Sequence, residues 1–153
     1  MNRNAALPLR PDFIYCATDL PFAVNWVFER DRMGDYQAGY MKPPHNYPLA
    51  RAVAASSCFP PIFSPLKPGL APPDLKGGAV RGKQRDEIVQ SMSLTDGGVY
   101  DNMGLEPVWK NHAVLLVSDG GATFDAGPDR GFFWQLSRFT AVMSNQAGAV
   151  RKR

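Results

Sequence analysis

Residues 112–121, H-A-V-L-L-V-S-D-G-G, contain the most continuous apolar run of the chain and end in an Asp-Gly-Gly turn. Continuous apolar runs of this length are typical of strands that a parallel sheet buries on both faces. A second Asp-Gly-Gly turn follows the shorter run S-M-S-L-T at 91–95. Two such strand ends indicate an α/β protein whose functional side chains gather where strands end.

The first half of the chain adds strand patterns to this framework. F-I-Y-C-A-T-D-L at 13–20 predicts a buried strand, because it is apolar on both faces and closes at a proline. Residues 25–31 predict a second, antiparallel and more exposed strand, with 34–40 as its turn and return. The loop K-P-P-H-N-Y-P follows at 42–48.

Helix patterns lie between and after these strands. The alanine-rich segment 48–59 predicts a helix with Pro48 at its first position, packed closely against a sheet through its small residues. Residues 104–111 predict a helix start, with Asn102 as the N-cap. Residues 130–153 predict a helix that shows no stop signal and looks cut off. Its apolar residues recur at helical spacing, at Phe132, Leu136, Phe139 and Met143.

Segment 60–90 has no clear periodicity and is rich first in proline and glycine and then in charge. Such a stretch predicts a loop, either a variable surface insertion or a lid, and the first is the more common.

Composition narrows the class of protein. The chain has 153 residues, of which 44% are hydrophobic, enough for one domain or a piece of one with a real core. The net charge of +3 comes without a basic stripe interleaved with aromatics, which excludes nucleic acid as the expected partner. Cys16 and Cys58 form no C-x-x-C pair, so we do not expect a cysteine metal site. The N-terminal residues show no signal peptide and no run is long enough to span a bilayer, which predicts a cytoplasmic or peripheral membrane protein.

Asp96 is the candidate catalytic residue, because glycines at 97 and 98 let a carboxylate at a strand end stand clear of the sheet. The alternative is that Asp-Gly is a common turn dipeptide. A metal site at Asp96 and Asp101 stays open but has no third ligand nearby. The remaining polar candidates are read as structural or surface residues: Ser56, Ser57, Ser118, His45 and His112.

Four segments together resemble the patatin-like phospholipase family, most closely its bacterial branch. They are F-I-Y-C-A-T-D-L, P-L-A-R-A-V-A-A-S-S-C-F-P-P-I-F-S-P-L, L-T-D-G-G-V-Y-D-N-M-G-L-E-P-V and V-L-L-V-S-D-G-G, in that order over residues 11 to 125. One departure is Pro21-Phe22-Ala23, where the family often has a glycine. The resemblance implies a three-layer α/β/α acyl hydrolase fold.

The resemblance also implies a Ser–Asp dyad that hydrolyses lipid or phospholipid esters without a cofactor. Asp96 matches the dyad aspartate, Gly97 and Gly98 match its turn, and Asp119 matches a strand end outside the dyad. Asp101 and Asn102 are expected to hold the turn. In the family, the G-x-S-x-G serine and the oxyanion loop precede the A-T-D-L strand, and this sequence contains no G-x-S-x-G.

We therefore expect residues 1–153 to be the C-terminal part of a patatin-like domain that is inactive without its N-terminal half. Without a nucleophile, a base alone has no covalent route to ester hydrolysis. The alternative is a degenerate, non-catalytic module that binds a lipid surface or a protein partner.

Overall fold

The computed structural model describes residues 11–42, 46–118 and 126–151, with side chains of the last helix only as far as residue 143. The strands are β1 (Tyr15–Asp19), β2 (Val24–Phe28), β3 (Met33–Asp35), β4 (Gly39–Met41), β5 (Lys76–Gly77) and β6 (Leu94–Asp96). The helices are α1 (Leu49–Ser56), the short 3-10 turn η2 (Pro72–Asp74), α2 (Lys83–Gln90), α3 (Gly98–Asp101) and α4 (Phe132–Arg151). His45 and Asp119 lie outside the described residues.

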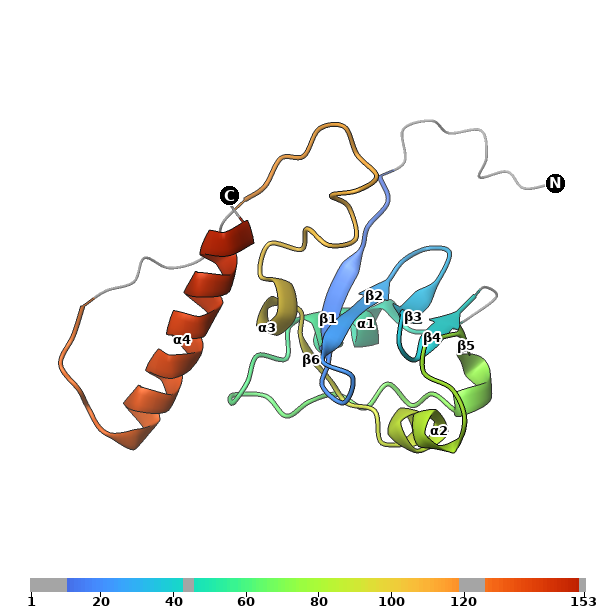
Figure 1. Cartoon of the computed structure of the whole chain (residues 1–153), viewed down its shortest axis with the longest axis horizontal. Helices are drawn as coiled ribbons and strands as arrows, with labels where there is room; N and C mark the ends of the chain where they lie inside the picture. Colours follow the sequence, from blue (N-terminus) through green and yellow to red (C-terminus); the bar gives the residue numbers. More distant parts are fainter. Residues whose placement is uncertain (1–10, 43–45, 119–125, 152–153) are drawn as a thin grey trace.

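Six strands form one sheet in the order β5-β4-β3-β2-β1-β6, and every pairing is antiparallel. Figure 1 shows β1 within this sheet, between β2 and β6. The described part is therefore a mixed α/β protein with an antiparallel sheet. The antiparallel second strand and its return, predicted for 25–40, are confirmed as β2, β3 and β4. The expected exposure of the second strand was wrong, because all five residues of β2 are buried.

Helix α1 packs on β1 and β6 and closes the core. Its Ala52 and Ala55 are buried, and Trp26 and Leu94 of the sheet are fully buried beneath it. The predicted helix and its small-residue contact are thus confirmed. Pro48 differs in one detail, because its extended backbone makes it the residue before the first turn and not part of it.

Segment 60–90 is more ordered than a loop, since it contains η2, β5 and α2. Arg85 of α2 anchors it by donating hydrogen bonds to the carbonyl oxygens of Ala38 and Leu75. The helical pattern is hard to see in the sequence because α2 buries only Val89 in a polar stretch. A single buried position gives no periodicity to detect.

The strand predicted at 112–121 does not form over 112–118, and this prediction was wrong for those residues. Val114 and Leu116 are 77% and 97% exposed. A strand needs a free edge to pair with, and the outer edge of β6 is already taken. Leu94 exchanges both backbone hydrogen bonds with Leu66, and the amide of Asp96 donates to the Cys58 carbonyl. The apolar run is left without a ladder among the described residues.

The predicted helix at 104–111 is also absent, and its residues form turns. Asn102 ends α3 and does not start a new helix. The carboxylate of Asp101 takes the role expected of an N-cap, because its Oδ2 accepts the amides of Leu105 and Glu106 at 2.8 and 2.9 Å. These bonds hold a turn and leave no continuing helical ladder.

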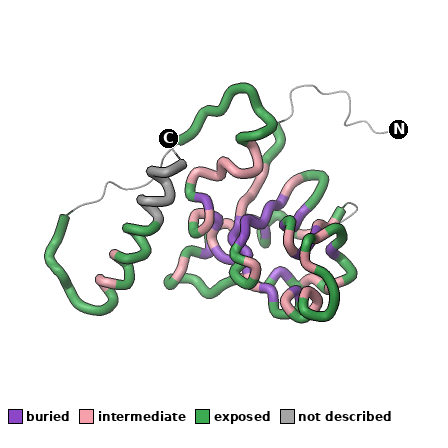
Figure 2. Tube along the Cα trace, viewed as in Figure 1, coloured by how far each residue is buried: buried purple, intermediate pink, exposed green. Residues whose placement is uncertain are grey.

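Helix α4 confirms the helix predicted at the end of the chain and stands apart from the sheet (Figure 1). Figure 2 colours its described residues as mostly exposed, while buried residues concentrate in the sheet and around it. Within the described ranges, no helix is both long and apolar enough to cross a membrane.

The turn from β1 to β2 carries a strained residue. Ala23 has a φ of 54°, and among the described residues it alone combines a side chain with a positive φ. This is the turn where the resemblance led us to expect a glycine. An L-residue in this conformation loses stability that glycine keeps.

We predict that Ala23→Gly raises the free energy of unfolding by about 0.5–1 kcal/mol, because the relief of left-handed strain exceeds the entropy that glycine adds to the unfolded chain. The matched control is Ala54→Gly on the exposed side of α1, which should lower it by about 1 kcal/mol. Urea unfolding of the three proteins measures both changes. Equal destabilisation by the two substitutions would contradict the strain at Ala23.

Candidate functional site

Asp96 ends β6 directly opposite Ala17 of β1, which places the first Asp-Gly-Gly turn beside the A-T-D-L strand. The hydroxyl of Thr18 ties the two together. It donates to the Asp96 carbonyl at 2.8 Å and accepts the amide of Tyr100 at 3.1 Å. One side chain of β1 therefore fixes both the start of the turn and the helix α3 that follows it.

Space is tight at both glycines, against backbone at Gly97 and against the ends of side chains at Gly98. A Cβ on Gly97 would collide with the carbonyl oxygen of Cys16, and one on Gly98 would lie 2.9 Å from the Asp96 carboxylate and from Asn102 Oδ1. Gly97 itself has an ordinary helical backbone with a φ of −62°. Close approach, and not a left-handed conformation, explains this glycine pair.

The Asp96 side chain is half-buried and oriented by the turn. Its Oδ1 accepts the amide of Gly98 at 2.7 Å. No hydrogen bond within the described residues engages its Oδ2. One carboxylate oxygen is therefore fixed by the backbone while the other stays available to a partner, which is the arrangement a general base needs.

Asp96 lines a cavity of about 480 Å³. Asp101, Cys16 and Ser56 reach the same cavity, together with the turn at 102–104. The volume falls within the range of small-molecule sites. The cavity combines a carboxylate, a thiol and a hydroxyl in one concave site.

Cys16 does not supply a nucleophile to this cavity. Burial raises the pKa of its thiol, and the hydrogen bond from Asn25 offsets this only in part. A thiol held in its protonated form is a weak nucleophile.

Asp101 is committed to structure. It is buried, its Oδ1 accepts the amide of Met103 at 3.2 Å, and its Oδ2 accepts two further amides. The expectation that Asp101 holds the turn is confirmed. The part of the chain that the structure describes contains no group of three or more His, Cys, Asp or Glu side chains placed to bind a metal ion.

The structure separates the serine and histidine candidates. Ser56, at the end of α1, shares the cavity with Asp96, and its carbonyl accepts the amide of Gly97 at 3.4 Å. Ser57 is exposed and its hydroxyl donates to the Val53 carbonyl. Ser118 is exposed and does not line the cavity, and His112 is exposed beside the Val108 carbonyl. Sequence reasoning missed the proximity of Ser56 to Asp96, because only the tertiary packing of α1 on β6 creates it.

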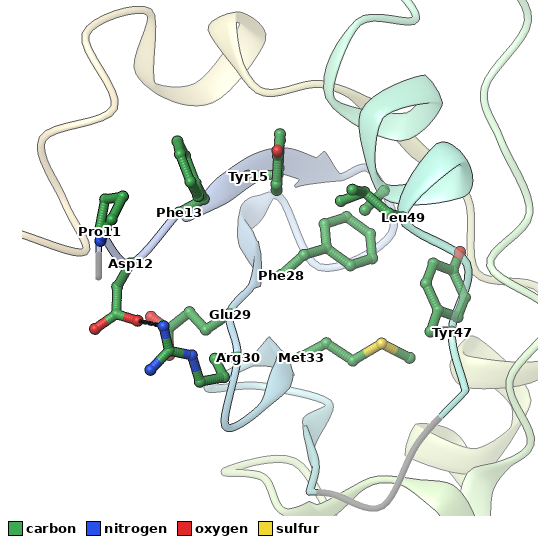
Figure 3. A pocket seen from close by; sticks show the side chains of 11 residues that line it. Pro11, Asp12, Phe13, Tyr15, Phe28, Glu29, Arg30, Met33, Tyr47 and Leu49 are labelled. Carbon is green, nitrogen blue, oxygen red and sulfur yellow. Dashed lines mark ion pairs between the residues drawn. The ribbon is translucent and has the colours of Figure 1, made fainter. Parts of the chain in front are cut away.

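A second, apolar cavity of about 300 Å³ lies at the open end of the core (Figure 3). Its wall includes Phe28 and Tyr47, whose rings stack with their centroids 5.5 Å apart. Asp12 and Arg30 form an ion pair at one side of it. Both acids that line this cavity, Asp12 and Glu29, are engaged in ion pairs with Arg30 and Arg32. The Asp96 cavity is therefore the candidate site.

Comparison of the chain with protein-family models, curated proteins and solved structures gives no match.

We predict that Gly97→Ala lowers the free energy of unfolding by about 1–3 kcal/mol, because its methyl group meets the backbone of β1, which cannot move aside cheaply. Gly127→Ala is the matched control, since a Cβ there meets nothing within 4 Å. That substitution should change stability by less than about 0.5 kcal/mol. Denaturant unfolding separates the two, and a neutral Gly97→Ala would refute the close approach of the turn to β1.

Proposed function

We propose that this chain is part of a patatin-like lipid acyl hydrolase domain with a three-layer α/β/α fold, in which Asp96 is the general base of a Ser–Asp dyad. The observation that carries the proposal is the state of the Asp96 carboxylate. One oxygen is held by the Gly98 amide, the other has no hydrogen bond from any described residue, and Asp96 lines a cavity. The A-T-D-L strand and the alanine-rich helix both border this carboxylate.

The serine of the dyad lies, in this proposal, on a segment outside these 153 residues, because the sequence contains no G-x-S-x-G. Its hydroxyl would pass a proton to Asp96 Oδ2 as the oxygen attacks the ester carbonyl of a lipid. The ester C–O bond then breaks, and the lipid alcohol leaves with the proton from Asp96 while the acyl group stays on the serine. Water that gives a proton to Asp96 attacks this acyl-enzyme and releases the free acid, and the proton returns to the serine. Oxyanion donors would come from the same upstream segment.

The exposed apolar run at 114–117 is consistent with this arrangement. Val114 and Leu116 are largely exposed, and a contiguous apolar patch of this kind marks a surface that another segment covers. An upstream strand would provide the hydrogen-bonding edge that the run lacks among the described residues.

We predict that ester hydrolysis by a longer polypeptide, which carries the upstream G-x-S-x-G segment together with these residues, falls by about 10²–10⁴-fold in Asp96→Asn, because the amide cannot accept the serine proton. The control is Asp31→Asn, an exposed acid outside the cavity, which should leave the rate unchanged. Release of a chromogenic acyl ester measures both. A fully active Asp96→Asn protein would contradict the proposed base.

A second candidate function, a module that binds lipid surfaces, is favoured by α4. Phe132, Leu136, Phe139 and Met143 form a stripe at helical spacing, and all four are exposed. Segment 130–153 contains no acidic residue and carries basic residues at 130, 138 and 151–153. Aromatic apolar residues with basic neighbours are typical of helices that lie in an anionic membrane interface.

If α4 binds membranes, Phe139→Asp should weaken sedimentation with vesicles of anionic phospholipid about tenfold. The substitution removes an aromatic ring that would insert into the membrane interface. Ser137→Asp is the matched control, since it adds the same charge to an exposed position away from the stripe. The module hypothesis requires the first variant to lose clearly more binding than the second. Equal losses would leave only non-specific charge attraction and refute it.

A further inference from the structure

Two carboxyl groups are buried together in the sheet, away from the Asp96 cavity. Asp19 at the end of β1 is fully buried, and Asp35 at the end of β3 is 1% exposed. The strand register places both on one face, because Asp19 pairs with Val24 of β2 and Met33 of β3 pairs with Phe28 of β2. Residues two apart on a strand share a face.

Each carboxyl group has one oxygen satisfied by backbone and one that is not. Asp19 Oδ1 accepts the amide of Phe22 at 3.2 Å, and Asp35 Oδ1 accepts the amides of Gln37 and Ala38 at 2.7 Å each. Both Oδ2 atoms are buried and receive no hydrogen bond from an ordinary donor among the described residues. The two side chains instead interact with each other.

Two ionised carboxylates cannot form a hydrogen bond, because both groups are acceptors. One proton between them satisfies both Oδ2 atoms at once and removes one buried charge. Asp19 is the better proton carrier. Asp35 accepts two short amide bonds that favour its charged form, and the positive charge of Arg85 acts in the same direction.

We propose that Asp19 and Asp35 share one proton and act as a pH-sensitive latch that holds the β3–β4 hairpin against β1. Release of the proton to solvent leaves two facing carboxylates in the core and opens this contact. The latch is distinct from the proposed hydrolase chemistry and does not depend on it.

The charged and titratable surroundings of the pair are few. Arg85 of α2 acts on Asp35, and Tyr40 of β4 interacts with the same carboxyl group. β2 separates the two aspartates and contributes no titratable side chain. No second cation is placed near the pair by the described interactions, so the shared proton is the main source of compensation.

The latch lies outside the Asp96 cavity but is linked to the Asp-Gly-Gly turn along β1. Thr18, which binds the Asp96 carbonyl and the Tyr100 amide, immediately precedes Asp19 on β1. A shift of Asp19 would therefore move Thr18, the next residue of β1, and with it the Asp-Gly-Gly turn that Thr18 binds.

The direction of the pH dependence follows from proton binding. Burial, with the charge of Asp35 second, raises the pKa of Asp19 to about 7, and burial also raises the pKa of Asp35. The folded chain thus binds a proton more tightly than the unfolded chain, whose aspartates titrate near pH 4. The contribution of this pair to stability is therefore fully present below about pH 4, falls as pH rises toward 7, and is lost above that range.

We predict that the unfolding constant of the full chain rises by about tenfold per pH unit between about pH 4 and 7, the slope for one linked proton. In Asp19→Asn the slope should disappear, because the amide donates to Asp35 at every pH. The control Asp31→Asn changes an exposed acid and should keep the slope. Hydrogen exchange of the Gln37, Ala38 and Tyr100 amides should accelerate with the same pH dependence beyond the intrinsic rate.

The unsubstituted protein provides a test that does not depend on any variant folding. The ¹³C signal of the Asp19 carboxyl group should titrate near pH 7. Titration of this group near pH 4, or a slope that is the same in Asp19→Asn and in the unsubstituted chain, would overturn the latch.

Discussion

Hydrogen bonding of β1 along both edges organises the rest of this protein. β2 pairs with one edge over its full length, and β6 pairs with the other. Three successive residues of β1 then serve different regions. Ala17 is buried in the core, Thr18 fixes the Asp-Gly-Gly turn, and Asp19 contacts Asp35 of β3. Because strand side chains alternate, Ala17 and Asp19 lie on one face of β1 and Thr18 on the other, so one short strand contacts the core, the candidate site and the buried acid pair.

The elements that the sequence predicts well are those whose signal is local. β1 and α1 were recognisable because strand and helix periods, prolines and small residues lie within the element itself. The turn after Asp96 was also predictable, since its two glycines announce a close backbone approach. The structure supports the close approach at Gly97 and not a left-handed backbone there.

The two incorrect predictions, a strand at 112–118 and a helix at 104–111, depend on contacts with residues outside those segments. The run at 114–117 has the composition of a buried strand, yet strand formation depends on a free edge, and Leu66 and Cys58 occupy the outer edge of β6. The Asp101 carboxylate accepts the amides of Leu105 and Glu106, just before the turns at 106–111, a contact that no local pattern predicts. The Asp19–Asp35 contact joins residues from two non-adjacent strands, so no pattern within either strand could reveal it.

The Asp96 site, too, could be predicted from the sequence only in part. Its aspartate and glycines are visible as a motif, whereas the cavity and the position of Ser56 within it depend on how α1 packs against the sheet. The orientation of the Asp96 carboxylate agrees with the role of a base and does not by itself provide an acyl acceptor. The central claim is therefore that Asp96 serves a serine that these residues do not contain.

Labelling of the purified 153-residue protein with a fluorophosphonate probe tests that claim most directly, with intact-mass detection and with folding verified by dispersed amide resonances. Such probes form a covalent adduct only with an activated serine, and activation needs a base within hydrogen-bond reach. Our account predicts no adduct on the folded chain. A single adduct that maps to Ser56 would contradict it, because the partner of Asp96 would then lie in the same cavity and in the same chain.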